Sequence, residues 1–244
     1  MRLTQKVLAL LLLAGMAFGG YHAWKMQTDV NAEADLHGEA LQFKPTAPAA
    51  GALASPGGTV KNEAIVRLRA QNPAGVGWLT IPHTGIDYPF VQAADNKYYL
   101  TRDLKGDTAK AGTIFMDYRN ARDFSDFNTI LYGHNLHSGA MFAGLKLFAE
   151  QDFFEATPGG TLFLEEQTYT LAFFAYLLVR VDDSVIYSAN PGDQTAYLAY
   201  LKQNAKQYRE PGLQAGERIV TLSTCAYDYN GARMVLLAVL REQE

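Results

Sequence analysis

The chain has 244 residues, of which 48% are hydrophobic and 19% charged, a composition that supports a folded core and differs from that of disordered proteins. Its formal net charge of −4 disfavours a nucleic-acid binder, because neutralising phosphates requires a basic face. The single cysteine excludes an intrachain disulfide and any site built from several thiolates. The role of that one thiol is therefore the main functional question.

Residues 1–27 are predicted to form a membrane anchor. The run from Val7 to Trp24 contains no Asp, Glu, Lys or Arg, and the basic residues Arg2 and Lys6 precede it. At about 1.5 Å per residue, a helix over this run reaches roughly 27 Å, close to the thickness of a bilayer's hydrocarbon core. Basic residues before the run favour a cytoplasmic N-terminus, so the rest of the chain would lie outside the membrane. A cleaved signal peptide is the alternative, and it exports the same domain.

Residues 28–60 are predicted to be a flexible stalk. Within them, residues 46–59 are rich in Ala, Pro and Gly and show no apolar periodicity. The composition changes at Lys61, where Ile65 and Leu68 indicate a short amphipathic helix. We therefore expect the folded domain to span residues 61–244.

After Gly77 the sequence is typical of strands, with short β-branched and aromatic runs divided by Gly, Asp, Asn and Pro. The predicted strands are residues 78–82, 86–91, 112–116, 129–132, 161–164, 169–181, 218–222 and 234–239. About eight strands predict a barrel or a sandwich.

Two helices are predicted among these strands, each with one packing face. The first follows Ser138 as a possible N-cap, and the second follows Asp193. Their packing faces consist of Met141, Leu145 and Phe148 in the first and of Tyr197, Leu201 and Tyr208 in the second. We expect both helices to pack on the core rather than to form a binding groove.

Cys225 ends a predicted strand that begins at Ile219. The ends of strands are places where a rigid scaffold presents reactive groups. A free cysteine is also often a small buried hydrophobe, which is the structural alternative. Because an unpaired thiol is a liability in an oxidising compartment, export favours a chemical role for Cys225.

A nucleophilic thiol needs a proton partner, and the chain has five histidines. His22 and His37 fall in the predicted anchor and stalk, and His83 is in a predicted turn. His134 is the better candidate, because it follows the predicted strand 129–132 and Gly133. His134 and His137 could also suggest a metal site, but no Cys pair or acidic residue lies within this motif, so none is predicted.

Arg233 precedes the last predicted strand and follows Cys225 across residues 226–232. The Asn230-Gly231 pair is a strong turn signal, so the two strands are predicted to form an antiparallel hairpin. This hairpin would bring the thiol and the guanidinium to the same end of neighbouring strands. A guanidinium there could stabilise the oxyanion of an acyl-transfer reaction, whereas an isolated Arg would be an ordinary solvated residue.

Taken together, these motifs resemble the class B sortases, cysteine transpeptidases of Gram-positive cell surfaces. The resemblance covers roughly residues 61–242, and its most specific parts are Thr221-Leu-Ser-Thr-Cys225, Leu131-Tyr-Gly-His134 and Arg233. Further segments that match in the same order are residues 77–79, 86–92, 95–100 and 115–120, and the helix after Ser138. The resemblance implies a mainly β fold: a closed eight-stranded β-barrel with N-terminal helices and an additional helix before the cysteine strand. The predicted helix over residues 193–208 fits that additional element.

The resemblance also implies roles for individual residues. Cys225 would be the nucleophile, His134 the general acid and base, and Arg233 the group that holds the oxyanion or positions the substrate. It implies no cofactor and no metal. Some family members have an acid directly after the cysteine, where this chain has Ala226, so any contact of that acid is absent. The residues that the resemblance places along the substrate groove are Asn96, Leu100, Tyr132 and Ser223, with Ser184, Ile186 and Tyr187 as a possible wall.

The implied reaction cleaves a C-terminal sorting motif after Thr through a thioacyl intermediate and joins the exported protein to an amine. The expected partners are proteins with a sorting motif, a peptidoglycan precursor or pilin amine as acceptor, and the cytoplasmic membrane. The enzyme would be a single-pass membrane protein with an extracellular catalytic domain. A secreted cysteine peptidase that only hydrolyses its substrate is the first alternative, and a surface binding module without catalysis is the second.

Overall fold

A computed structural model describes residues 3–46, 61–226 and 231–243, without the side chains of residues 3–9 and 225. The chain divides into two compact units, Met1–Glu39 and Ala40–Glu244. The helices are α1 (Leu3–Ala40), η1 (Leu41–Phe43), α2 (Glu63–Gln71), η2 (Tyr98–Thr101), η3 (Phe142–Ala149), α3 (Gln151–Ala156) and α4 (Gln194–Asn204), where η marks a 3-10 helix. The strands are β1 (Gly75–Ile81), β2 (Ile86–Val91), β3 (Ile114–Met116), β4 (Asn128–Tyr132), β5 (Gly159–Phe163), β6 (Thr168–Arg180), β7 (Gln207–Tyr208), β8 (Arg218–Cys225) and β9 (Ala232–Glu242).

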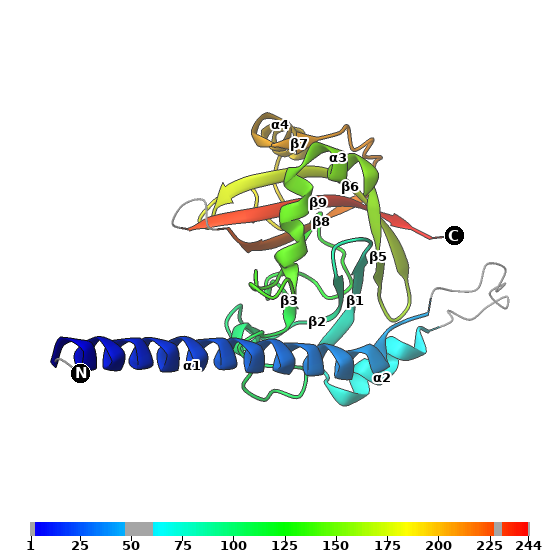
Figure 1. Cartoon of the computed structure of the whole chain (residues 1–244). Helices are drawn as coiled ribbons and strands as arrows, with labels where there is room; N and C mark the ends of the chain where they lie inside the picture. The colour runs from blue at the N-terminus through cyan, green and yellow to red at the C-terminus, as the bar shows by residue number, and fades with distance from the viewer. Residues whose placement is uncertain (1–2, 47–60, 227–230, 244) are drawn as a thin grey trace. The chain divides into compact units, whose positions relative to one another are not determined.

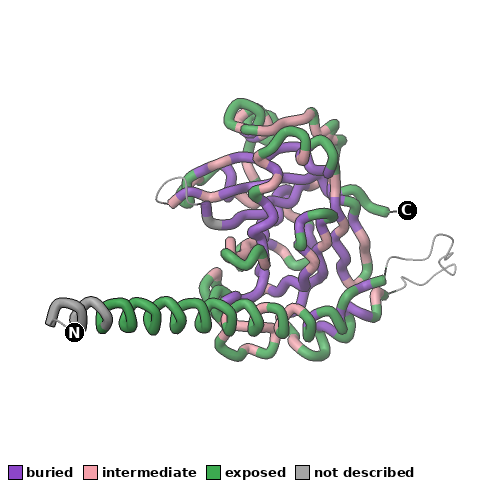
Figure 2. Tube along the Cα trace, in the orientation of Figure 1, coloured by how far each residue is buried: buried purple, intermediate pink, exposed green. Residues whose placement is uncertain are grey.

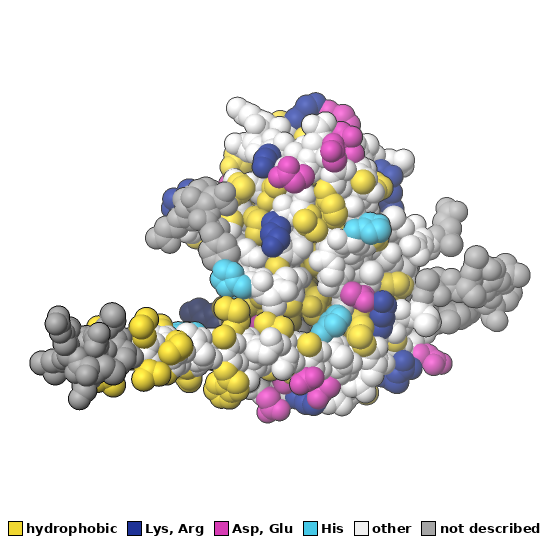
Figure 3. Space-filling view, viewed as in Figure 1, with side chains coloured by type: hydrophobic (Ala, Val, Ile, Leu, Met, Phe, Trp, Pro, Cys, Tyr) yellow, Lys and Arg dark blue, Asp and Glu magenta, His cyan; other side chains and the backbone are white. Residues whose placement is uncertain are grey.

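Helix α1 makes up most of the first unit. Large hydrophobic side chains are exposed along its described part, among them Leu10, Leu13, Phe18 and Trp24 (Figure 3). No helix in the described part of the chain combines the length and apolar character needed to cross a membrane. Of the predicted anchor, residues 1–2 and the side chains of residues 3–9 lie outside this description.

The second unit is built on a closed β-barrel (Figure 1). Its strands pair in the order β5-β1-β2-β3-β4-β8-β9-β6, and β6 pairs with β5 to close the ring. The two-residue strand β7 adds to β6 on one side of this ring. The prediction of a closed eight-stranded barrel is confirmed, with β7 as an additional strand among the described residues.

Strand β9 shows how the barrel is packed on both of its surfaces. Leu236 and Ala238 belong to one core cluster, and the alternating Leu237 and Val239 belong to another. Successive side chains of a strand point to opposite faces, so both faces of β9 are covered. The second cluster also contains Tyr197 of α4, which therefore packs outside the barrel wall. Figure 2 shows the resulting continuous burial of the central strands.

Part of the predicted stalk belongs to the folded unit. Residues 28–43 are helical where a flexible stalk is predicted, and residues 47–60 lie outside the described residues. Phe43 is buried with Leu68 of α2 and Trp78 of β1. The predicted helix after Lys61 is present as α2. Asn62 caps it, because its side chain accepts hydrogen bonds from the backbone amides of Ala64 and Ile65 in the first turn.

Both helices predicted between the strands differ from the prediction in extent or type. The segment after Ser138 becomes the 3-10 helix η3, which starts only after Met141 at a positive φ of 55°. Helix α4 begins as predicted at its cap Asp193 but ends at Asn204. Tyr208 lies in β7 instead, because the chain turns to pair with β6. The predicted apolar faces are nevertheless buried in the core, apart from the partly buried Tyr208.

Candidate active site

The candidate nucleophile ends β8, and the candidate base follows β4, the parallel strand that is hydrogen-bonded to β8. In the register of β4 and β8, Tyr132 pairs with Ser223. The backbone amide of Gly133 continues this pairing, donating to the carbonyl of Ser223 at 3.2 Å. His134 and Cys225 each lie two residues beyond the paired positions. Their backbones therefore reach the same end of the barrel wall, although the sequence separates them widely.

The third candidate residue comes from the neighbouring antiparallel strand. Cys225 of β8 pairs directly with Arg233 of β9. The amide of Ala226 also donates to the carbonyl of Ala232 at 3.0 Å, so the two strands stay paired past the cysteine. The predicted β8–β9 hairpin is thus present, whereas Asn230 of its predicted turn lies outside the described residues.

A cleft of about 270 Å³ opens at this end of the barrel. Its described lining includes both His134 and Arg233. The remaining lining residues are Asn96, Leu100, Phe115, Tyr132, Gly133, Val181, Tyr187, Ser223 and Thr224. None of these described lining residues is Asp or Glu, so the cleft is suited to an uncharged, extended segment of peptide.

His134 is held by a backbone carbonyl on the opposite wall of the cleft. Its Nε2 donates to the carbonyl oxygen of Leu100 at 2.6 Å. Because a carbonyl oxygen can only accept, Nε2 carries a hydrogen, and Nδ1 has the free lone pair in the neutral ring. Gly133 is needed beside it for a packing reason, since an added Cβ would lie 2.8 Å from the ring of Phe142.

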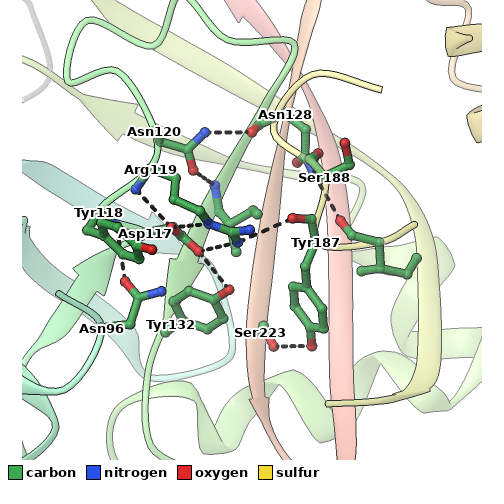
Figure 4. Close-up of polar contacts among 12 residues, drawn as sticks. Asn96, Asp117, Tyr118, Arg119, Asn120, Asn128, Tyr132, Tyr187, Ser188 and Ser223 are labelled. Carbon is green, nitrogen blue, oxygen red and sulfur yellow. Dashed lines mark hydrogen bonds and ion pairs between the residues drawn. The ribbon is translucent and has the colours of Figure 1, made fainter. Parts of the chain in front are cut away.

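Tyr132 joins the cleft to a buried carboxylate. Its hydroxyl donates to Oδ2 of Asp117 at 3.0 Å, and the side chain of Asp117 is fully buried (Figure 4). Burial and the adjacent negative charge of Asp117 both raise the pKa of Tyr132 well above its usual range. Tyr132 is therefore a neutral hydrogen-bond donor at neutral pH.

The wall near α4 is formed by Tyr187 rather than by Ile186. Ile186 is fully buried in the outer core cluster and is not among the residues that line the cleft. The hydroxyls of Tyr187 and Ser223 lie 2.9 Å apart and share a hydrogen bond (Figure 4). Ser184, which was also considered for this wall, is not among the described lining residues.

Sequence reasoning did not single out three features of this site. Phe115 and Val181 line the cleft, and Asp117 lies behind it. Phe115 and Asp117 fall within the segment 115–120, which contributed to the resemblance without any role attached to its residues. The available signal for Asp117 was its place after a buried strand and two residues before Arg119, an arrangement that suggests an ion pair.

Comparison with known proteins identifies the family to which the chain is similar. The family model described as "Sortase domain" matches residues 79–241. Sortase B of Listeria monocytogenes is 40% identical over 183 residues, which are 73% of this chain and 74% of that protein.

Solved structures are similar over the same region. The crystal structure of Staphylococcus aureus sortase B has a TM-score of 0.70 at 27% identity and covers 76% of this chain and 89% of that chain. A Streptococcus pyogenes class B sortase involved in pilus biogenesis has a TM-score of 0.68 at 28% identity, with 72% and 97% covered. The chain therefore belongs to the sortase family of cysteine transpeptidases, and within that family to class B.

Proposed function

We propose that Cys225, His134 and Arg233 carry out the transpeptidation, and that the cleft between them holds a sorting peptide. The observation that carries this assignment is the strand register, in which Cys225 is opposite Arg233 and level with His134. Three neighbouring strands of a closed barrel give these positions a fixed separation, as acyl transfer requires.

In the first half-reaction, the thiol of Cys225 gives its proton to Nδ1 of His134, and the resulting thiolate attacks the carbonyl carbon of a Thr in the sorting motif. The carbonyl oxygen becomes an oxyanion, and the guanidinium of Arg233 stabilises it. His134 then gives a proton to the leaving amine as the C–N bond breaks, which leaves a thioester on Cys225.

In the second half-reaction, an acceptor amine attacks the thioester. His134 takes a proton from this amine, the C–S bond breaks, and the thiolate of Cys225 is restored. Because Nε2 of His134 is bound to the carbonyl of Leu100, we assign these proton transfers to Nδ1.

We further propose that Asn96, Leu100, Tyr132 and Ser223 contact the sorting peptide. All four line the cleft, and they offer one amide, one aliphatic group and two hydroxyls without a negative charge. The acceptor is a primary amine of a peptidoglycan precursor or of a pilin. The catalytic domain acts at the cell surface, and the N-terminal segment, uncharged from Val7 to Trp24, tethers it to the cytoplasmic membrane.

A peptide library tests this assignment. The full-length chain is incubated with fluorogenic peptides, with and without an acceptor peptide that offers the amine of a glycine or a lysine. The products are identified by mass spectrometry. We expect cleavage after Thr and, with amine present, a ligated product. If both reactions release only a peptide that ends in a free carboxylic acid, the enzyme is instead a peptidase that only hydrolyses. If no peptide in the library is cleaved, the proposed substrate is refuted.

The same experiment includes a trapping step. Acid quenching during turnover should leave the N-terminal part of the peptide attached to Cys225, the only cysteine of the chain. An acyl group found on any other residue would contradict the assignment of the nucleophile.

A further inference from the structure

We propose that Asp117 and Arg119 are positioning residues for the substrate cleft, an inference that depends on the proposed function of that cleft. Asp117 follows β3 and its side chain is fully buried, whereas the Arg119 side chain is 48% exposed. Neither residue lines the cleft, so their effect on substrate must pass through the residues that do.

The two side chains form a paired, charge-assisted contact. Nε of Arg119 donates to Oδ1 of Asp117 at 2.9 Å, and Nη2 donates to Oδ2 at 2.7 Å. The backbone amide of Arg119 also donates to Oδ1 at 2.9 Å. Burial would raise the pKa of Asp117, but the hydrogen bonds and positive charge of Arg119 outweigh it and hold that pKa below its ordinary value. Asp117 is therefore a carboxylate at neutral pH.

This carboxylate reaches two residues of the cleft. It accepts the hydroxyl hydrogen of Tyr132, and the side chain of Asn96 also hydrogen-bonds to it. The other end of Asn96 is fixed as well, because its Oδ1 accepts from the backbone amide of Tyr118 at 3.0 Å. Figure 4 shows Asn96 and Tyr132 beside each other, both close to Asp117. Two cleft residues from separate segments are thus oriented by one charge.

Arg119 extends the same network to two further residues of the cleft lining. Its Nη2 donates to the backbone carbonyl of Tyr187 at 3.3 Å, and the hydroxyl of Tyr187 pairs with Ser223. Asn96, Tyr132, Tyr187 and Ser223 are the cleft's amide and three of its hydroxyls, and every one of them is connected to the Asp117–Arg119 pair. A single ion pair thereby connects the polar residues of the cleft to one another.

Positioning of this kind predicts a defect in substrate binding with little effect on the nucleophile. His134 is held separately by Leu100, and the Cys225 backbone is held by its pairing with Arg233 of β9. Without the carboxylate charge, Asn96 and Tyr132 lose a shared partner and the cleft is no longer preorganised for the peptide. We expect the KM of Asp117→Asn to rise about ten-fold, the scale of one charge-assisted hydrogen bond, while kcat changes less than about two-fold.

The test uses the full-length chain and the peptide that the wild-type enzyme cleaves fastest in the library. Asp87→Asn is the matched control, because Asp87 is another carboxylate held by a cation and a hydroxyl, with bonds from Lys44 and Thr80. Its side chain is 22% exposed, and it does not line the cleft. We expect the control to keep the wild-type KM. Equal KM values for Asp117→Asn and Asp87→Asn would overturn the proposal.

A double-mutant cycle separates positioning from a general loss of structure. Tyr132→Phe removes the hydroxyl through which Asp117 acts, so its effect on KM and that of Asp117→Asn should not multiply in the double variant. Fully multiplicative effects would mean that Asp117 does not act through Tyr132, and would refute this step. If Asp117→Asn does not fold, Arg119→Gln breaks the same pair at its half-exposed member and should raise KM in the same way.

Alkylation of Cys225 by iodoacetamide distinguishes failure of this inference from failure of the proposed function. The chain contains one cysteine, so the rate reports on that thiol alone and needs no peptide. We expect the same rate in Asp117→Asn and the wild type. A slowed alkylation in Asp117→Asn would place the defect at the nucleophile and contradict a role in the cleft walls, whereas absence of peptide cleavage by the wild type would refute the function on which the inference rests.

Discussion

Strands β4 and β8 carry polar residues at both ends of their pairing, and the two ends differ in their access to solvent. At one end, Asn128 is completely buried, and its Oδ1 accepts a hydrogen bond of 2.7 Å from Oγ1 of Thr221, a buried residue in the middle of the same pairing. At the other end, Tyr132 and Ser223 line an open cleft. The same two strands therefore contribute to one polar network that is closed to solvent and to a second one that lines the cleft.

The closed network connects separate segments of the fold. The Nδ2 of Asn128 donates to the carbonyls of Ser188 at 2.9 Å and Ile186 at 3.1 Å. Buried polar groups cost free energy when their partners are removed, so this network should mainly affect stability. The open network lines the proposed substrate cleft, so changes there should mainly affect activity. The comparison teaches that access to the cleft, rather than polarity, distinguishes the two ends of these strands.

The largest expected effect tests the open end. Cys225→Ala and His134→Ala should each abolish peptide cleavage, by roughly 10⁶-fold for loss of a nucleophile and at least about 10²-fold for loss of an acid and base. Thermal unfolding should show an unchanged fold in both variants. His137→Ala is the control for the histidine, since His137 is exposed and does not line the cleft. Full activity of Cys225→Ala would exclude the enzyme mechanism.

Arg233→Ala should have the next largest effect. Loss of one group that stabilises an oxyanion lowers kcat by about 10²- to 10³-fold, and single-turnover measurement of thioester formation would detect it. Arg241→Ala is a suitable control, because Arg241 lies near the other end of the same strand. An acylation rate within about three-fold of the wild type would remove Arg233 from the mechanism.

At the closed end, Asn128→Ala should lower the free energy of unfolding by about 3 kcal/mol, because it leaves a buried hydroxyl and two carbonyls without their partner. For a domain of this size the melting temperature should fall by about 10 °C. Below that temperature kcat should remain close to the wild-type value. Asn204→Ala, which removes one exposed hydrogen bond at the end of α4, should have almost no effect on melting. A loss of kcat larger than the loss of stability explains would show that the two ends are not separable.

The smallest effect concerns the pH dependence of stability. The pKa of Asp117 lies below its ordinary value of 3.8 in the folded protein, so the folded state binds fewer protons there than the unfolded state. The resulting stability is fully present above the ordinary pKa and is lost as the pH falls through the folded one. Asp117→Asn should therefore flatten the decline of melting temperature between about pH 5 and pH 2. An unchanged slope would show that Asp117 is not the group responsible.

Much of the barrel could be predicted from the sequence, because local signals determine it. The short β-branched runs identified all eight barrel strands, and the Asn-Gly pair identified the β8–β9 hairpin that places Arg233 opposite Cys225. The position of His134 could not be derived in that way. It depends on the parallel register of β4 and β8, which no turn connects and which only the resemblance implied.

Other differences arise where neighbouring residues compete for burial. Ile186 and Tyr187 are adjacent, and the sequence does not tell which of them faces the cleft; the aliphatic side chain enters the core and the tyrosine keeps its hydroxyl at Ser223. Phe43 lies in a segment with few apolar residues, so its burial against Trp78 was not foreseen. The local signal of Asp117, an Arg two residues later, does not reveal its role, because that role depends on a contact with Tyr132 from another segment.

The placement of β9 has a consequence for the timing of activity during synthesis. This strand is the last of the barrel in sequence, but it lies between β8 and β6 in the sheet and carries Arg233. While a ribosome or an export channel still holds residues 232–242, the barrel cannot close and the nucleophile strand lacks one of its two neighbours. The emerging polypeptide should thus be inactive until β9 has paired with β8 and β6.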